Sequence, residues 1–220
     1  MQKFDTTAPV TAVLDVPAGH LRFIAADRAD TTVEVRPVDA GKSRDVKAAE
    51  QTTVEYHDGV LHITTTAKNQ LLGPSGYVEI TVGLPAGSRV EAKAAAADLR
   101  GVGRLGAVVF DGSQGDIKLD EAASVHVTTH AGDVTLGRLT GPAEISTGKG
   151  DIRVTEATGG DLVLTTQAGD ITVDTAPGVS ASLDAGTAYG RIHNSLTNAG
   201  TPSVTIRATT AYGDVTARSL

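Results

Sequence analysis

A Gly-Asp pair followed by an apolar residue returns along the second half of the chain, and this repeat constrains the fold more than any other feature of the sequence. Internal repeats of roughly 20 residues are typical of chains built from one stacked structural unit. Five copies are complete, and two copies, which begin at Ala97 and Gly190, are degenerate. The glycines are Gly115, Gly132, Gly150, Gly169, Gly190 and Gly213, and the aspartate position holds Asp98, Asp116, Asp133, Asp151, Asp170, Arg191 and Asp214.

Each repeat contains two short segments in which apolar and polar residues alternate. Val125 and Val127 show the alternation before a Gly-Asp pair, and Ile171 and Val173 show it after one. A period of two indicates β-strands with one buried face. Successive aspartate positions are 18, 17, 18, 19, 21 and 23 residues apart, which is too short for a β-α-β crossover with its own helix. The spacing fits one rung of a β-solenoid, in which each rung pairs with the rungs on either side.

The sequence therefore predicts an all-β chain with a β-solenoid, or parallel β-helix, of about seven rungs and roughly 30 Å in length. An antiparallel β meander or sandwich has a similar periodicity and is the alternative. The longest spacings include "SLDAGTAYG" at 182–190 and "SLTNAGTPS" at 195–203, which we interpret as bulging loops. We divide one continuous structural unit into an N-terminal β-sheet region, 1–93, and the repetitive solenoid, 94–220.

We interpret each Gly-Asp pair as the corner between the two strands of a rung. Glycine accepts positive φ, and aspartate hydrogen-bonds the turning backbone. The aspartates would stack in a column, whose like charges need backbone donors or a cation to offset their repulsion. Arg191 is expected between Asp170 and Asp214, where it would relieve that repulsion. Calcium binding is the alternative, but calcium-binding solenoids carry G-G-x-G-x-D repeats, so we predict a structural turn ladder without a metal.

The first 93 residues also alternate like strands. His57-Asp58-Gly59-Val60 is typical of a tight hairpin. Residues 40–51 are polar and predict a short helix or a loop, and residues 67–76 predict a mobile loop. We expect this region to cover one end of the rod, because an open sheet edge invites pairing with other chains. At the other end the chain stops in "GDVTARSL", with no obvious cap.

Composition argues against several classes of function. The net charge of −7 disfavours nucleic-acid binding, which needs Lys and Arg to neutralise phosphates. The chain has no Cys, so disulfides and thiolate metal sites are excluded. The opening "MQKFDTTAPV" lacks the apolar core of a signal peptide, and no run approaches the ~20 apolar residues of a membrane span. We expect a cytoplasmic protein with no transmembrane segment; the cell surface is the alternative if a leader has been removed.

Two motifs suggest chemistry that their surroundings do not support. "ISTGKGDIRV" at 145–154 contains a Gly-Lys pair. A phosphate loop, however, needs Gly where Ala143 stands and Ser or Thr where Gly150 stands. His126 and His130 could share one face, but no third ligand follows at zinc-like spacing. We therefore interpret the histidines as ordinary surface residues.

Paired carboxylates deserve the same test, because parallel β-helices can carry polysaccharide-cleaving sites. Asp116, Asp133 and Asp151 would lie about one rung apart, near the ~5 Å spacing of a retaining glycosidase. A regular ladder produces that spacing everywhere, and aromatic residues, which could hold a sugar, make up only 3% of the chain. We predict no catalytic residues, no cofactor and no metal, and a small-molecule ligand is not expected.

The order of the motifs resembles a family of uncharacterised bacterial β-strand-repeat proteins. The resemblance rests on "TTVEVRP" at 31–37, "YHDGVLHIT" at 56–64, "YVEITVGLPAGSRVEAKAAAADLRG" at 77–101 and the Gly-Asp strands that follow. Members of this domain of unknown function are often labelled "putative adhesin". The resemblance implies a β-helix-like fold with no established enzymatic activity, and it supplies no catalytic residues.

These observations favour a noncatalytic structural or interaction protein, scaffold-like or adhesin-like. We expect a protein partner or self-association, with strands added at the uncapped C-terminal rung, residues 213–217. The alternative is a β-helix at the cell surface that binds or cleaves carbohydrate.

Overall fold

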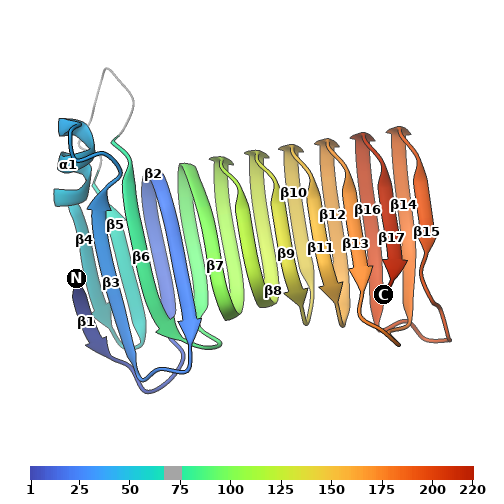
Figure 1. The fold of residues 1–220 in the computed structure, drawn as a ribbon, viewed down its shortest axis with the longest axis horizontal. Helices are drawn as coiled ribbons and strands as arrows, with labels where there is room; N and C mark the ends of the chain where they lie inside the picture. Colours follow the sequence, from blue (N-terminus) through green and yellow to red (C-terminus); the bar gives the residue numbers. More distant parts are fainter. Residues whose placement is uncertain (67–75) are drawn as a thin grey trace.

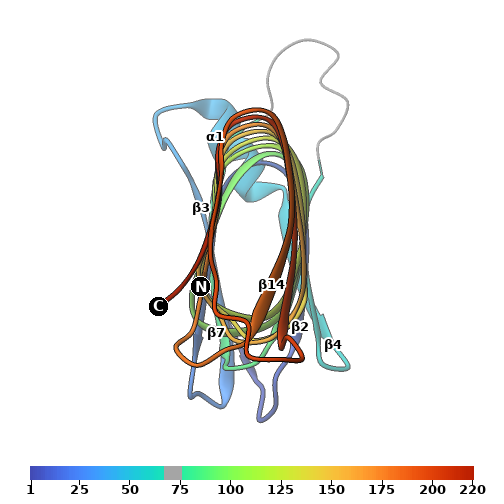
Figure 2. The same cartoon turned by 90° about the vertical axis from the view of Figure 1, so that its right-hand side faces the viewer.

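The computed structural model describes residues 1–66 and 76–220. Its strands form one open sheet that winds into a flattened coil and does not close into a barrel, and the coils stack along one axis as a rod (Figure 1). Seen along that axis, each coil is an oval with two long walls joined by corners (Figure 2). The chain is therefore all-β, as the period of two predicted.

The first wall consists of strands that run in the same direction and pair in register. β10 pairs in parallel with both β8 and β12, and β16 pairs in parallel with both β12 and β14. The antiparallel meander is thereby wrong for the repeats. From the middle of the rod to its end, the wall contains β7 (Arg89–Gln114), β8 (Ile117–Ala131), β10 (Ala143–Lys149), β12 (Gly160–Ala168), β16 (Val204–Tyr212) and β14 (Ala181–Tyr189).

The second wall follows the same rule on the opposite side of the oval. β7 and β8 are long enough to turn a corner and contribute to both walls, so the first half of β8 pairs in parallel with β9. Parallel pairing then continues to the end of the rod. This wall adds β9 (Val134–Leu139), β11 (Ile152–Ala157), β13 (Ile171–Thr175), β17 (Val215–Ser219) and β15 (Ile192–Ser195).

The last two coils do not follow the order of the chain. β16 lies between β12 and β14, and β17 lies between β13 and β15. The prediction that residues 213–217 form the open end is therefore wrong, because β17 has neighbours on both sides and the end belongs to β14 and β15. Residues 182–190 were expected to bulge, but most of them belong to strand β14.

The long spacings in the sequence have a physical reason in this order. After β13 the chain passes over the position that β16 and β17 will occupy, and after β15 it returns to fill that position. At about 4.8 Å for each neighbouring strand, both crossings need additional connecting residues. These residues lie at 176–180 and 196–203, between the strands.

Aliphatic side chains fill the space between the two walls. Buried and exposed residues alternate along most strands, which directs one side chain in two inward. Inward residues of successive coils lie in register, and each fully buried aliphatic side chain contributes about 1.5–3 kcal/mol. One such column contains Ile117, Val134, Ile152, Ile171 and Val215, each at most 1% exposed.

The N-terminal region continues the walls and then covers their end. β2 (Thr11–Ala26) pairs in parallel with β7 and, on its other side, with β5 (Val60–Thr65) and β6 (Val78–Pro85). Antiparallel strands and helix α1 follow at this end of the rod (Figure 1). These elements are β1 (Gln2–Asp5), β3 (Asp30–Pro37), β4 (Thr52–His57) and α1 (Ser43–Glu50).

Two local predictions for this region are confirmed. Asp58 and Gly59 have φ of 51° and 80° and join β4 to β5 in a tight antiparallel hairpin. Residues 40–51 contain helix α1, which packs against β3 and β6. The loop expected at 67–76 lies outside the described residues except for Gly76. Strand β7 runs without interruption through residue 93.

Candidate functional site

The aspartates of the repeat lie in one column at a corner of the oval. In each coil the backbone N–H at the aspartate position donates a hydrogen bond to Oδ1 of the aspartate in the adjacent coil. Six such bonds run along the rod without interruption. Their N–Oδ1 distances are 3.0 Å for Asp116 to Asp98, 2.9 Å for Asp133 to Asp116, 2.8 Å for Asp151 to Asp133, 2.8 Å for Asp170 to Asp151, 2.7 Å for Asp214 to Asp170 and 2.8 Å for Arg191 to Asp214.

The glycine before each aspartate allows neighbouring coils to approach closely. Gly150 has a φ of +141°, and a Cβ placed there would collide with the carbonyl group of Gly132 in the next coil. Any larger residue would separate the coils and break the backbone hydrogen bonds beside the corner. The same collision would occur at Gly115, Gly132, Gly169, Gly190 and Gly213.

One end of the column carries a group of opposite charge to the aspartates. Arg191 was expected between Asp170 and Asp214, but that position is wrong because the last coils are out of chain order. Instead, Asp214 follows Asp170, and Arg191 lies at the end of the column. The Arg191 guanidinium donates from Nη2 and Nε to Oδ2 of Asp214, at 2.8 and 3.2 Å. These hydrogen bonds lower the pKa of Asp214 below its ordinary value.

His20 lies at the other end of the column, a position that was not predicted from the sequence. Its Nδ1 lies 3.2 Å from Oδ2 of Asp98. Gly19-His20-Leu21 pairs in register with Ala97-Asp98-Leu99, so His20 occupies the aspartate position of an earlier coil. The signal was present in the sequence as "GHLRF", which follows the Gly-Asp pattern with His in place of Asp.

A second column, made of threonine hydroxyls, lies beside the first. A threonine stands three residues before the glycine in most repeats, and its Oγ1 donates to the glycine carbonyl of an adjacent coil. This hydroxyl satisfies a backbone acceptor at the corner where the strand ladder is interrupted. The pairs are Thr147 to Gly132 at 3.4 Å, Thr166 to Gly150 at 3.0 Å, Thr210 to Gly169 at 3.0 Å and Thr187 to Gly213 at 3.0 Å.

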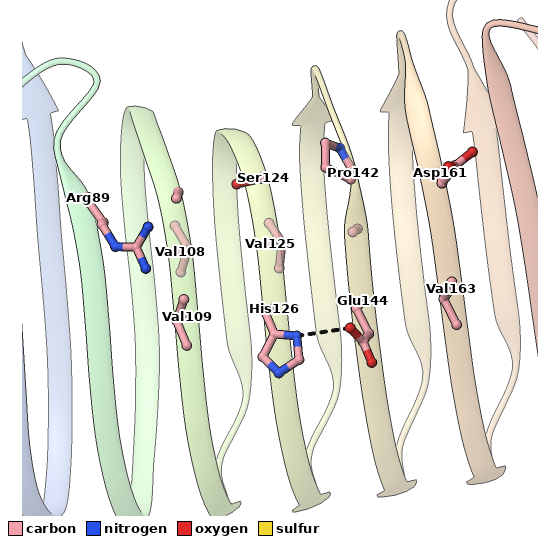
Figure 3. A pocket seen from close by; sticks show the side chains of 12 residues that line it. Arg89, Val108, Val109, Ser124, Val125, His126, Pro142, Glu144, Asp161 and Val163 are labelled. Carbon is pink, nitrogen blue, oxygen red and sulfur yellow. Dashed lines mark ion pairs between the residues drawn. The ribbon is translucent and has the colours of Figure 1, made fainter.

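The histidines that could have formed a metal site lie apart on the outer surface. His126 Nδ1 lies 3.3 Å from Glu144 Oε2, within a shallow hollow of about 340 Å³ on the first wall (Figure 3). Val109 and Val163 flank this ion pair, and His130 lines a different hollow. Among residues 1–66 and 76–220, no group of three or more His, Asp or Glu side chains is arranged to hold a metal ion.

The end of the rod opposite α1 is an incomplete coil, which we call the open coil and define as residues 181–195. Within the described residues, β14 pairs with no strand but β16, and β15 with no strand but β17. The segment after β15 covers the start of the outer edge of β14, where the Ala181 N–H donates to the Thr197 carbonyl at 3.0 Å and Leu196 packs against the core. The rest of each outer edge has no strand beside it. Ile192 lies in register with Val215 and, beyond it, Ile171, yet it is 48% exposed while those two are buried. The core therefore opens to solvent at this end.

Two tyrosines stack at the corner of the open coil. Tyr189 and Tyr212 pair in register, with ring centroids 5.0 Å apart and planes 4° from parallel. Their exposed fractions are 68% and 60%. The low aromatic content of the chain gave no indication of this pair. The verbatim repeat "TAYG" at 187–190 and 210–213 was the signal that could have identified the pair.

Stacked parallel strands, Gly-Asp corners and aliphatic columns define the class of this protein as an all-β repeat protein with a solenoid-like fold. Residues 13–219 match the family model Toastrack DUF4097, a domain of unknown function, so the chain belongs to this family. The family resemblance found in the sequence is thereby confirmed. In the described part of the chain, no helix has the length and apolar character needed to cross a bilayer.

Solved structures of bacterial proteins align with this chain over most of its length. A "putative adhesin" from Bacteroides fragilis aligns with a TM-score of 0.57 at 12% identity, covering 98% of this chain and 95% of that chain. A "putative adhesin" from Parabacteroides merdae gives 0.48 at 12% identity, covering 98% and 94%. A "putative cell adhesion protein" from Clostridium sporogenes gives 0.40 at 12% identity, covering 100% and 98%. No curated protein matches the chain in sequence. The likeness to the Bacteroides structure shows a shared fold.

Proposed function

We propose that the protein is a noncatalytic, adhesin-like interaction protein that binds a protein partner through its open coil. The observation that carries this proposal is the unpaired edge of β14 and β15, which surrounds an exposed part of the core. Unpaired backbone N–H and C=O groups at a sheet edge accept an additional strand, and apolar side chains beside them supply the rest of the affinity. Strand addition was predicted at residues 213–217, and we now propose that it occurs at the open coil instead.

The Asp and Thr columns support a structural role for the repeat and leave the open coil as the interaction site. Each aspartate in the column uses Oδ1 to accept a backbone hydrogen bond, and the outermost ones also pair with His20 and Arg191. A carboxylate that is held in this way stabilises the corner by satisfying a backbone donor. We propose no enzymatic activity because the aspartates have this structural role and because a structure called a "putative adhesin" shares the fold.

The proposal is tested by changing the open coil without disturbing the fold. Ile192 is 48% exposed, so Ile192→Lys adds a charge at the edge without burying it. Val163, on the outer face of the first wall, is 38% exposed and provides the matched control Val163→Lys. Circular dichroism and denaturant unfolding should be the same for all three proteins.

Each immobilised protein is then incubated with an extract of its native cells, and the retained proteins, including the chain itself, are identified by mass spectrometry. We expect at least one protein to be retained by the wild type and by Val163→Lys but to be lost with Ile192→Lys. Retention of the same set by all three proteins would show that the open coil is not the binding site, and the proposal would be wrong.

Carbohydrate binding at the cell surface is a second candidate, favoured by the stacked rings of Tyr189 and Tyr212. Exposed aromatic faces form platforms for apolar faces of ligands, and the Arg191–Asp214 pair lies in the same two coils and could supply polar contacts. A glycan array probed with the wild type and with Tyr189→Ala tests this candidate. Binding that is lost in the variant supports it, and an absence of glycan binding to the wild type rejects it.

A further inference from the structure

We propose that the partner of the open coil is a second copy of this chain, joined end to end in a closed dimer with antiparallel strands across the junction. The inference rests on the proposed function, because it names the partner of the same site. A dimer of this kind explains why two strand edges and the core between them are exposed together. It also limits the assembly to two copies.

The shape of the open coil selects the partner. β14 continues the first wall beside β16 and β15 continues the second wall beside β17, on opposite sides of the oval seen in Figure 2. Aliphatic side chains lie between the two walls. A single extended peptide could pair with only one of these edges and would leave Leu183, Ala185 and Ile192 partly uncovered. A partner that covers everything must present two strands at the same separation with aliphatic side chains between them. The same end of a second copy has this form.

Charge does not oppose this contact. The whole chain carries a net charge of −7, which makes most faces of two copies repel one another. Residues 181–195 contain one acidic residue, Asp184, and one basic residue, Arg191, so the open coil has no net charge when His193 is neutral. The end of the rod is therefore a surface at which two acidic molecules can meet.

Symmetry sets the direction of the strands. Two copies placed end to end are related by a two-fold axis across the rod. When this axis passes through both walls, it reverses the direction of the strands in each wall, so β14 meets β14 of the second copy and β15 meets β15, each pair antiparallel. Antiparallel pairs form ladders with unslanted hydrogen bonds and need no connecting segment.

The other end of the rod explains why the assembly would stop at two copies. There, the first wall ends at β4 and the second wall ends at β1, beyond β3, so the two walls have different lengths. Helix α1 packs against β3 and β6 at this end. Among the described residues at that end, no pair of edges matches the open coil. Head-to-tail contacts, which would continue into a fibre, are therefore disfavoured.

Cysteine cross-linking tests the proposed symmetry directly, because the chain contains no native Cys. Asp184→Cys, Gly186→Cys and Ala188→Cys each place one thiol along β14. An added Cβ at Gly186 meets no atom within 4 Å, so this site accepts a side chain. In an antiparallel pair about a two-fold axis, the residue nearest the axis faces its own copy. We expect at least one variant to form a disulfide-linked dimer under mild oxidation, whereas Glu55→Cys on β4 remains monomeric.

Sedimentation equilibrium measures the strength of the contact. The wild type and Val163→Lys should dimerise with the same dissociation constant, and Ile192→Lys should raise this constant at least about tenfold, equivalent to about 1.4 kcal/mol. Species larger than a dimer are not expected at any concentration.

The outcomes separate the inference from the proposed function. A wild type that stays monomeric while another protein binds in an Ile192-dependent manner overturns the dimer and keeps the proposed function. Dimers that survive Ile192→Lys, or that cross-link through Glu55→Cys and not through β14, overturn the end-to-end dimer, and they overturn the proposed function as well if no other protein binds in an Ile192-dependent manner. Fibres or larger oligomers overturn the closed symmetry alone.

Discussion

Asp151 shows how one side chain links three coils of the rod. Its backbone N–H donates to Asp133 Oδ1, and its own Oδ1 accepts the N–H of Asp170, both at 2.8 Å. A residue that acts as donor and acceptor in one column can repeat without limit, which explains why the Gly-Asp pair is repeated along the chain. The carboxylate repulsion that accompanies such a column is reduced at one end by Arg191.

The contribution of one corner can be measured with Asp151→Ala. The change leaves the Asp170 amide without its acceptor, and we expect the free energy of unfolding in urea to fall by about 1 kcal/mol. Asp151→Asn keeps an acceptor oxygen and should cost less. Asp161→Ala, on the outer face of the first wall, serves as the control and should change the stability by less than about 0.5 kcal/mol. Equal losses in all three variants would contradict a specific role for the corner.

Gly150 tests whether the corner needs glycine for close approach as well as for its backbone angle. Gly150→Ala combines strain at a φ of +141° with a collision against Gly132, so the free energy of unfolding should fall by about 3 kcal/mol or more. Gly178→Ala has a φ of +77° but no atom within 4 Å of the new Cβ, and it should cost only about 1–2 kcal/mol. Similar costs at both sites would mean that backbone angle alone selects glycine.

The Arg191–Asp214 ion pair predicts how the stability of the folded chain depends on pH. The guanidinium holds the pKa of the Asp214 carboxyl below its ordinary value, so the ion pair stabilises the folded chain above that value. This stabilisation disappears as the pH falls through the lowered pKa. In Arg191→Gln, the pKa of Asp214 should return toward its ordinary value, as measured by NMR titration of the carboxyl carbon. A pKa that does not move would show that Arg191 does not hold the carboxylate.

At the level of elements, the order of the last strands is the most distinctive feature of the rod. Val163 on β12 pairs in register with Arg207 on β16, and Arg207 pairs with Asp184 on β14. Val163 and Asp184 are therefore two coils apart, although β14 follows β12 more closely in sequence.

Double Cys variants can verify this order in the Cys-free chain. Val163→Cys with Arg207→Cys should form an intramolecular disulfide, because adjacent strands bring the Cα atoms to about 5 Å. Val163→Cys with Asp184→Cys should not, since two coils separate these Cα atoms by about 9–10 Å. The reverse result, read by mass spectrometry after oxidation, would show that the coils follow the order of the chain.

The sequence allowed the parallel coil to be predicted but not the order of its last coils. The period of two and the Gly-Asp spacing are local properties, and each repeat carries them independently. Which coils become neighbours depends on how apolar surfaces match, and all repeats offer nearly the same Val, Ile and Leu pattern. In the sequence, the spacings of 21 and 23 residues were the sign that the chain passes over a coil position and later returns to fill it. Bulging loops would have given the same spacings.

The candidate site was predictable to a similar extent. The positions of the corner residues follow from the repeat, and the structure places them in one column. Arg191 was placed wrongly because its neighbours depend on the order of the coils. The stack of Tyr189 on Tyr212 was missed for a different reason: β14 and β16 are neighbours in either order of the coils, but the repeated "TAYG" was not interpreted as a pair of stacked rings.

At the scale of the whole molecule, the two ends of the rod differ in a way that fits an interaction protein. One end is covered by antiparallel strands and α1, and the other presents β14 and β15 with the core between them (Figure 1). A rod with one covered end can stack its coils without becoming a fibre and still offer one adhesive surface.

Hydrogen exchange of the backbone amides, followed by mass spectrometry at increasing protein concentration, tests this account most directly. We predict that the amides of β14 and β15 exchange more slowly as the concentration rises, while those of β4 and β9 keep their rates. The Ile192→Lys variant should show no such slowing. Unchanged exchange in β14 and β15 at every concentration, or slowing confined to β4 and β1, would contradict an open coil that joins two copies.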